Sequence, residues 1–335
     1  MKCIVTGATG HIGCALIREL CRKGYDVTAF VLPGDRADAI REEPVKIITG
    51  DVCNPYDTVR AFSGFDVVFH LAGMIAIDSS KRKRMRKINV DGTRNVIRAC
   101  KIAKVKRLVY VSSVHAIREP AKGSCVFETD RFDPKDVKGD YAKTKAEATR
   151  LVLEAAKEGL DAVVVHPSGV IGPYEYSLSN IGQLMVDAIN GGLKAYIDGA
   201  YNFVDVRDVA RGIRLAAEKG GRGECYILSG EVVTVKEMLD IITRAAGKKP
   251  VRAKLPYWLA MATAPLSELY YKPVKRKPLY TAYSIYTLRT NCHFNCSKAM
   301  KELGYRFRPA AESLADAVEW LFTNGVFRNS STPAA

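Results

Sequence analysis

The segment TGATGHIG near the N-terminus constrains the fold more than any other part of this sequence. It places Gly7, Gly10 and Gly13 between an apolar run at 2–7 and an amphipathic stretch at 11–24. A tight strand-to-helix turn needs residues without a Cβ, so that backbone N–H groups can approach a phosphate at the positive end of the helix. This context on both sides predicts a dinucleotide-binding turn rather than an ordinary loop.

Runs of Val, Ile and Leu alternate with helix-like segments through the first half of the chain. Strands that are apolar along their whole length are typical of a parallel sheet covered by helices on both faces. We therefore predict an α/β fold with a doubly wound parallel sheet, the Rossmann arrangement. The expected strands lie at 2–7, 25–32, 45–52, 65–73, 107–113 and 160–172, and the expected helices at 11–24, 89–105 and 141–159.

Beyond residue 172, helices, prolines and short irregular pieces replace this alternation. We expect a smaller, mainly helical substrate-binding domain that lies over the ends of the sheet. The predicted division is a dinucleotide-binding domain at 1–172, completed by about 200–229, a substrate-binding portion at 173–199 and 230–328, and a disordered tail at 329–335.

The composition is that of an ordinary globular protein, with 335 residues of which 47% are hydrophobic. The first residues enter a strand-like run without the pattern of a signal peptide, and no apolar stretch reaches the ~20 residues of a membrane helix. A cytoplasmic protein without a membrane span is therefore expected. The nine cysteines show no metal-ligand spacing, so we expect reduced thiols and no metal site.

The formal net charge is +15, and part of it is concentrated in two runs. Six of the seven residues at 81–87 and four of the six at 272–277 are Lys or Arg. The simplest interpretation is a solvated surface, and the alternative is an electrostatic guide for an anionic ligand such as a phosphorylated cofactor or a CoA-like substrate. Nucleic acid is not expected, because neither run carries interleaved aromatic residues.

The Tyr-x-x-x-Lys pattern occurs twice, at Tyr141/Lys145 and at Tyr271/Lys275. This spacing puts both side chains on one face of a helix. An ammonium beside a phenol favours the phenolate, so the tyrosine can exchange a proton near neutral pH. Only the first pair follows an apolar strand that ends in two serines, and Pro273 interrupts the second pair. We therefore assign the chemistry to the first pair.

Further motifs are spread over nearly the whole chain. They are GDV, HLAG, NVDGTRNV, VYVSS, HPSGVIGP and FVDVRDVARG, which begin at residues 50, 70, 89, 109, 166 and 203. Together with the glycine turn they resemble the extended short-chain dehydrogenases/reductases, the NAD-dependent epimerase/dehydratase family. The later segments SKAMKELGY and AVEWL are similar to dihydroflavonol reductases, cinnamoyl-CoA reductases and related bacterial oxidoreductases. The resemblance is specific for fold and cofactor chemistry and unspecific for substrate.

The resemblance implies a role for each matching position. Ser113, rather than Ser112, would hold the reacting oxygen; Tyr141 would transfer the proton, and Lys145 would tune Tyr141 and bind the nicotinamide ribose. Asn89 fills the fourth catalytic position of the family, near the proton relay. The implied cofactor-binding positions are Gly7, Gly10, His11, Ile12, Gly13, Asp51, Val52, Leu71, Ala72, Gly73, Tyr141, Lys145, Pro167 and Ser168. The family usually has arginine where this chain has His166, which we interpret as a neutral core histidine.

The end of the second predicted strand bears on the choice between NADP and NAD. A carboxylate there would bind the ribose 2′-hydroxyl of NAD and repel the 2′-phosphate of NADP. Leu32 and Pro33 follow the strand, and Arg36 is close enough in sequence to pair with a 2′-phosphate. We therefore predict NADP. NAD stays open, because Asp35 is one residue nearer and Leu32 replaces an arginine common in the similar reductases.

The predicted function is an oxidoreductase that reduces a ketone or aldehyde to an alcohol, or the reverse, by hydride transfer. An NAD-dependent sugar-nucleotide epimerase and a 3β-hydroxysteroid dehydrogenase are the alternatives. Val114 and His115 offer no carboxylate beside the serine, so an eliminating dehydratase is not expected. A silent cofactor sensor would be expected to lack the serine, tyrosine or lysine. The expected partner is a small carbonyl or alcohol substrate, and a homodimer is considered.

Overall fold

The computed structural model describes residues 1–35, 37–76, 79–121, 123–271, 285, 287–290 and 292–324. Three features of the sequence analysis lie outside the described residues. They are Arg36, the basic run at 272–277 with Lys275, and the tail at 329–335.

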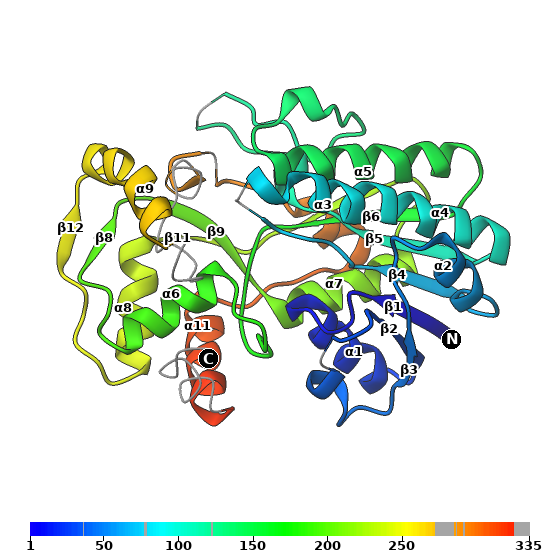
Figure 1. Ribbon diagram of the computed structural model, residues 1–335, viewed down its shortest axis with the longest axis horizontal. Helices are drawn as coiled ribbons and strands as arrows, with labels where there is room; N and C mark the ends of the chain where they lie inside the picture. Colours follow the sequence, from blue (N-terminus) through cyan, green and yellow to red (C-terminus); the bar gives the residue numbers. More distant parts are fainter. Residues whose placement is uncertain are drawn as a thin grey trace.

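A seven-stranded sheet forms the centre of the larger lobe (Figure 1). Its strand order is β10-β6-β5-β4-β1-β2-β3, and all neighbouring strands are parallel. The predicted doubly wound parallel sheet is therefore confirmed. The strands are β1 (Lys2–Thr6), β2 (Asp26–Val31), β3 (Lys46–Thr49), β4 (Val67–His70), β5 (Arg107–Val111), β6 (Ala162–Pro167) and β10 (Cys225–Leu228).

Helices cover both faces of this sheet, because alternate residues of each strand point to opposite sides. In β1, Cys3 and Val5 join a core with α1 and α7, whereas Ile4 joins a second core with α4 and α5 (Figure 1). These helices are α1 (His11–Arg22), α2 (Pro55–Ala61), α4 (Gly92–Ala103), α5 (Asp140–Lys157) and α7 (Val206–Lys219). Short 3₁₀ turns lie at η1 (Ala37–Ile40), η2 (Ser79–Lys81), η4 (Val114–Ala116) and η5 (Pro134–Asp136), and π-helical turns at η3 (Lys87–Asp91) and η6 (Ala299–Leu303).

The smaller lobe contains two short sheets that the sequence analysis did not anticipate. One has the order β11-β9-β7, and the other pairs β12 with β8. The strand β9, which the sequence division placed with the dinucleotide-binding domain, therefore pairs outside the seven-stranded sheet. The elements are β7 (Gly169–Ile171), β8 (Ala195–Ile197), β9 (Ala200–Asp205), β11 (Glu231–Thr234), β12 (Ala253–Leu255), α6 (Asn180–Ile189), α8 (Val235–Ala245), α9 (Tyr257–Tyr271) and α11 (Ala310–Thr323). Among the described residues, no helix combines the length and the apolar character that crossing a membrane requires.

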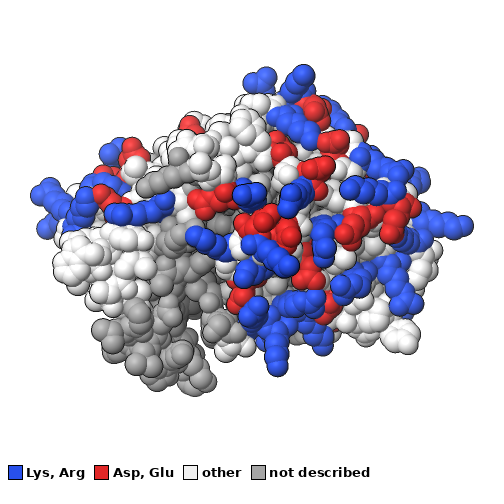
Figure 2. Space-filling view, turned by 90° about the horizontal axis from the view of Figure 1, so that it is seen from above, with Lys and Arg blue, Asp and Glu red and all other residues white. Residues whose placement is uncertain are grey.

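The basic run at 81–87 forms the short helix α3 (Arg82–Arg86) and its flanks. Met85 is fully buried, while the Lys and Arg side chains of the run are exposed. Arg82 pairs with Asp140 at 3.2 Å and Arg86 with Glu147 at 2.6 Å, both on α5. On the face that carries these helices, Asp and Glu side chains lie between the Lys and Arg side chains (Figure 2). This run is therefore a solvated surface, two of whose arginines fasten α3 to α5.

An ion-pair cluster fastens the segment before α11 to α7. Asp208 is 1% exposed and accepts hydrogen bonds from the backbone and guanidinium of Arg308 at 2.7 to 3.2 Å. Arg211 donates to the same carboxylate at 2.9 Å. A buried carboxylate with this many partners holds two segments about one hundred residues apart in sequence.

Replacing Asp208 by Ala should lower the free energy of unfolding by about 3 kcal/mol, because two guanidinium groups then lose a buried partner. Denaturant titration measures the change. The matched control is Asp240→Ala, which removes the half-exposed pair with Lys236 one helical turn away and should cost under about 1 kcal/mol. Equal losses for the two variants would contradict the structural role given to Asp208.

Candidate active site

The glycine turn closes on itself and on the neighbouring strand end. Gly7 has a left-handed backbone with φ of +68°, and a Cβ there would lie 2.7 Å from the backbone nitrogen of Ala72. A Cβ on Gly13 would lie 2.2 Å from the carbonyl oxygen of Gly7, and Gly10 donates its N–H to that oxygen at 3.1 Å. Side chains are thus excluded from the turn, and α1 begins without a side-chain cap. Such bare backbone at the start of a helix suits a pyrophosphate.

The turn after β4, at 71–73, lies between the glycine turn and the polar side chains of Asn89 and Lys145. Leu71 donates its N–H to the carbonyl of Thr6 at 3.1 Å, which holds the two turns side by side. A Cβ on Gly73 would lie 3.3 Å from Oδ1 of Asn89 and 3.5 Å from Nζ of Lys145. The absence of a side chain at Gly73 therefore leaves the space between the turn and these two polar groups open.

The two serines after β5 have different surroundings. The hydroxyl of Ser112 bonds Oγ1 of Thr149 at 2.7 Å and so belongs to the packing of α5 against the sheet. Oγ of Ser113 accepts the backbone N–H of His115 at 3.2 Å, which caps the turn η4. The hydroxyl hydrogen of Ser113 stays available for another acceptor, because an oxygen can accept and donate at once.

Lys145 carries its amino group into the protein interior. The side chain is 5% exposed, and Nζ donates to the carbonyl oxygen of Val111 at 2.8 Å and to the hydroxyl of Tyr110 at 3.5 Å. Nζ also lies 5.0 Å from the centre of the Tyr110 ring. Burial lowers the pKa of Lys145 to about 8, because it disfavours the ammonium. Tyr141 stands one turn earlier on the same helix.

Asn89 is buried in the π-helical turn η3, and its side chain is fully engaged. Oδ1 accepts the N–H of Met74 at 2.7 Å, and Nδ2 donates to the Met74 carbonyl and to Thr144, both at 3.0 Å. Asn89 thereby links the turn after β4 to α5 close to Lys145. An extra residue in a helical turn is often found at functional sites, because it redirects a side chain.

The end of β6 faces the same region. Nδ1 of His166 donates to the carbonyl oxygen of Ser113 at 3.0 Å, and the His166 ring stacks on Phe132 with centroids 5.3 Å apart. Burial lowers the pKa of His166 to about 4, so the ring is neutral at pH 7. Among the described residues, neither Nε2 of His166 nor Oγ of Ser168 has a hydrogen-bond partner, although both atoms are buried. The hydroxyl of Ser168 can therefore bond a polar group of a ligand beside Pro167.

The predicted adenosine end lies at the edge where parallel strands β1, β2 and β3 finish. Asp51 and Val52 follow β3 at this edge. Asp35, beyond β2, accepts a hydrogen bond from the hydroxyl of Thr9 in the glycine turn at 3.0 Å. A carboxylate therefore stands beside the phosphate-binding turn, while its neighbour Arg36 is outside the described residues.

A cavity of about 1050 Å³ is lined by both lobes. Ser113, Tyr141, Pro167 and Ser168 meet at one end of it, together with His11 and Ile12 from the start of α1. Lys145 and Asn89 lie behind this wall, and the Asp51–Val52 segment lies away from it. The rest of the lining is mainly apolar and includes Val170, Ile181, Leu184, Ile197, Phe203, Met238, Leu239, Leu255 and Leu288.

The loop around Tyr174–Ile181, where the sequence places part of the substrate choice, contributes to the lining of this cavity. Tyr174 has a left-handed backbone with φ of +74°, uncommon for a residue with a side chain. The guanidinium of Arg18, on α1, lies 4.4 Å from the centre of the Tyr174 ring and bonds the hydroxyl of Tyr176 at 3.4 Å. Glu175 lines the cavity, and its carboxylate accepts the N–H of Ser179 at 2.8 Å.

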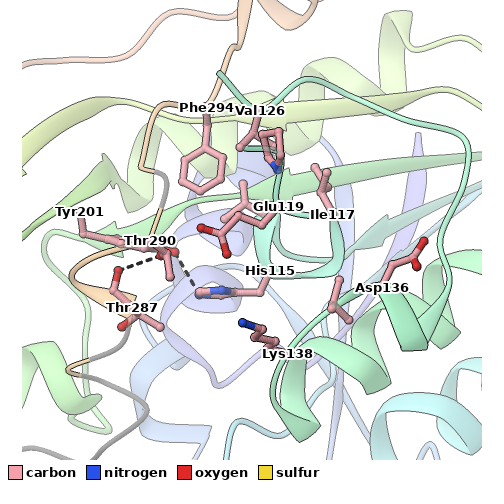
Figure 3. Close-up of a pocket in the computed structure, with 13 residues that line it drawn as sticks. His115, Ile117, Glu119, Val126, Asp136, Lys138, Tyr201, Thr287, Thr290 and Phe294 are labelled. Atoms are coloured by element: carbon pink, nitrogen blue, oxygen red, sulfur yellow. Dashed lines mark hydrogen bonds between the residues drawn. The ribbon is translucent and has the colours of Figure 1, made fainter. Parts of the chain in front are cut away.

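A second cavity of about 320 Å³ is lined in part by residues of the turn η4 (Figure 3). His115, Tyr201 and Thr287 line both cavities. The sequence analysis named His115 only as a neighbour that is not a carboxylate, and it did not name Tyr201. Their meeting could not be found from a local pattern, because they are 86 positions apart.

Comparison with known proteins agrees with this arrangement. Residues 3–229 match the model of the NAD-dependent epimerase/dehydratase family. A Synechocystis sp. protein with the provisional name dihydroflavonol 4-reductase is 31% identical, over 96% of this chain and 94% of its own. Sterol demethylase protein B of Methylococcus capsulatus is 30% identical, over 97% and 100%. The crystal structure of gox2253 is 33% identical, with a TM-score of 0.84, over 96% and 98%.

The fold and the glycine turn define a dinucleotide-binding enzyme with a parallel sheet and a site at its carboxyl edge. The chain belongs to the NAD-dependent epimerase/dehydratase family, in the extended short-chain dehydrogenase/reductase form. The sequence-based prediction of the family is confirmed, and so is the prediction of an NAD(P)-dependent oxidoreductase acting on CH–OH groups.

The buried ammonium gives a testable pH dependence. The pKa of Lys145 is lowered from 10.5 to about 8, so between these pH values the unfolded chain holds a proton that the folded chain has released. Stability contributed by this group therefore rises with pH over that window, by at most about 1.4 kcal/mol per unit. In denaturant titrations at pH 8 to 10, the cofactor-free protein should gain stability relative to Lys145→Met. A constant difference between the two proteins would contradict the shift.

Proposed function

We propose that this protein reduces a ketone or aldehyde to an alcohol, or catalyses the reverse reaction, with a nicotinamide dinucleotide as the hydride carrier. The observation that carries the proposal is the meeting of Ser113 and Tyr141 at one end of the main cavity. The buried amino group of Lys145 is bonded to Val111, two residues before Ser113, and so supports the same end.

The proposed chemistry divides among three side chains. A bound nicotinamide supplies or accepts the hydride. Tyr141 gives its proton to the substrate oxygen as negative charge develops there, and takes it back in the reverse direction. Ser113 donates its hydroxyl hydrogen to the same oxygen and holds it in place. Lys145 carries a positive charge below pH 8 and favours the phenolate form of Tyr141.

The residues present fit a dinucleotide along the carboxyl edge of the sheet. The glycine turn offers bare backbone for the pyrophosphate, and the unpartnered Oγ of Ser168 offers a hydrogen bond at the nicotinamide end. The positions proposed to hold it are Gly7, Gly10, His11, Ile12, Gly13, Asp51, Val52, Leu71, Ala72, Gly73, Tyr141, Lys145, Pro167 and Ser168. Asn89 is proposed to hold these residues in position through its hydrogen bonds to Met74 and Thr144.

The lining of the main cavity favours an apolar substrate. Among the described residues that line it, no arginine occurs; the two lysines are Lys143 and Lys194, and Lys194 donates to the carbonyl of Gly191 at 2.8 Å. Arginine is the residue best suited to bind the diphosphate of a sugar nucleotide, so a described lining without arginine gives the epimerase alternative less support. A 3β-hydroxysteroid dehydrogenase type of activity gains support from the aliphatic walls and from the sterol enzymes among the relatives.

We also propose the division of the chain into two functional parts. Residues 173–199 and 230–328 form the substrate-binding portion together with β9, which pairs in the smaller lobe and contributes to the cavity lining, and the remainder of the chain up to residue 229 binds the dinucleotide. The support is that α6, β8, α8 and β12 all contribute residues to the apolar lining.

The variant Tyr141→Phe should lower turnover on the order of 10²- to 10⁴-fold, because it removes the proton donor and little else. The measurement is the rate of NADPH or NADH oxidation with ketone and aldehyde substrates. Tyr271→Phe, in the second Tyr-x-x-x-Lys pattern, is the matched control and should leave the rate unchanged. Turnover in Tyr141→Phe equal to that of the parent protein would end the proposal.

We propose NADP as the preferred cofactor on the strength of Arg36, opposed by the carboxylate of Asp35 beside the glycine turn. Replacing Arg36 by Ala should lower kcat/KM for NADPH roughly tenfold or more relative to NADH, since a charge-assisted contact to the 2′-phosphate is lost. Asp35→Asn should shift the same ratio in the opposite direction. A parent protein that prefers NADH would contradict the choice of NADP.

A further inference from the structure

His115 and Tyr201 form a shared wall between the two cavities. His115 sits on the turn η4 that begins directly after Ser113, and Tyr201 sits on β9 of the smaller lobe. Figure 3 shows the His115 ring facing Tyr201, with the carboxylate of Glu119 and the amino group of Lys138 on either side of it. These two side chains therefore lie between the reactive end of the main cavity and a second cavity whose lining is part polar and part apolar.

The contacts of His115 fix its ring beside the reactive pair. Nε2 of His115 and the hydroxyl of Tyr201 share a hydrogen bond at 3.0 Å, and the two rings stack with centroids 5.9 Å apart. The ring also meets the Tyr141 ring edge to face, with centroids 6.2 Å apart. The backbone N–H of the same residue donates to Oγ of Ser113. His115 thus contacts both Ser113 and Tyr141, the two residues that are proposed to bind the substrate oxygen.

Tyr201 engages Nε2 of His115, so Nδ1 is the ring nitrogen that does not take part in this bond. Burial lowers the pKa of His115 to about 4, although the nearby Glu119 acts against this, so the ring is neutral at pH 7. A neutral imidazole can donate with one nitrogen and accept with the other. The cavity lining is mainly apolar, and His115 is a polar side chain of that lining next to Ser113 and Tyr141.

We propose that His115, held by Tyr201, is a specificity-determining contact that binds a second oxygen of the substrate, within a few bonds of the reacting carbonyl. A ligand oxygen bonded to the ring lies about 3 Å from its nitrogen. Because the His115 ring contacts the Tyr141 ring and its backbone N–H bonds Ser113, such an oxygen would lie near the one that Ser113 and Tyr141 are proposed to hold. The inference rests on the proposed function, since it names the substrate class of that site: apolar ketones or alcohols that carry a neighbouring hydroxyl or carbonyl group.

Paired substrates test the inference. Oxidation of NADPH and of NADH is measured with 1-phenylpropan-2-one and with 1-hydroxy-1-phenylpropan-2-one, and again with decal-2-one and a decal-2-one that carries a neighbouring hydroxyl. The parent protein should prefer the hydroxylated member by roughly tenfold or more in kcat/KM, the value of one hydrogen bond. Intrinsic reactivity of the carbonyl is the same for every variant, so a change in the ratio reports on the protein.

The variants His115→Leu and Tyr201→Phe should reduce this ratio to near its intrinsic value, and His115→Gln should keep part of it. Tyr25→Phe is the matched control, because its hydroxyl bonds Glu218 at 2.7 Å outside both cavities, and its ratio should equal that of the parent. Equal ratios in the parent and in both Tyr201→Phe and His115→Leu would overturn this inference alone. Absence of cofactor oxidation with every pair would overturn the proposed function and the inference with it.

Discussion

The hydrogen bond from the amino group of Lys145 to the carbonyl of Val111 ties helix α5 to the carboxyl end of β5. This bond fixes the position of Tyr141 relative to Ser113. Tyr141 lies one helical turn before Lys145 on α5, and Ser113 lies two residues after Val111, the last residue of β5. The amino group of Lys145 is buried against the ring of Tyr110, where little water screens its charge. The charge therefore acts on nearby groups more strongly than it would in water. The space beside it is kept open by Gly73 and bordered by Asn89.

The same bond holds the candidate catalytic side chains in fixed positions, although residues of both lobes line the cavity. The reactive end belongs wholly to the seven-stranded sheet and its helices, whose strands are buried on both faces. The smaller lobe contributes the apolar walls and Tyr201. Under the proposed roles, the chemistry belongs to the larger lobe, and the choice of substrate belongs to the smaller lobe together with His115, which is how one fold can serve many substrates.

Much of the fold could be predicted, because its signals are local. The apolar runs around β1, β4 and β5 and the periodicity of α1 each depend on neighbours within one element. The small sheets could not be predicted. Strands such as β8 and β12 have three residues each, and their pairing joins Ala195 to Ala253 across 58 positions of the chain. Such strands exist only because distant segments meet, so no local pattern marks them.

The candidate site divides in the same way. Gly7, Gly13, Ser113 and Tyr141 stand in motifs whose spacing follows from one turn or one helix, and the structure brings them to the carboxyl edge of the sheet. Their catalytic and binding roles stay predictions. The contact of His115 with Tyr201 depends on how the smaller lobe lies against η4, which no spacing encodes.

The left-handed backbone of Tyr174 has a consequence for Arg18 on α1. Arg18 covers the Tyr174 ring, bonds Tyr176 and also donates to the carbonyls of Cys14 and Ala39. The loop with the strained Tyr174 backbone is thus held in place by a side chain of α1. Saturation mutagenesis of the chain would therefore find that Arg18 tolerates few substitutions, although no role in binding phosphate or substrate is proposed for it.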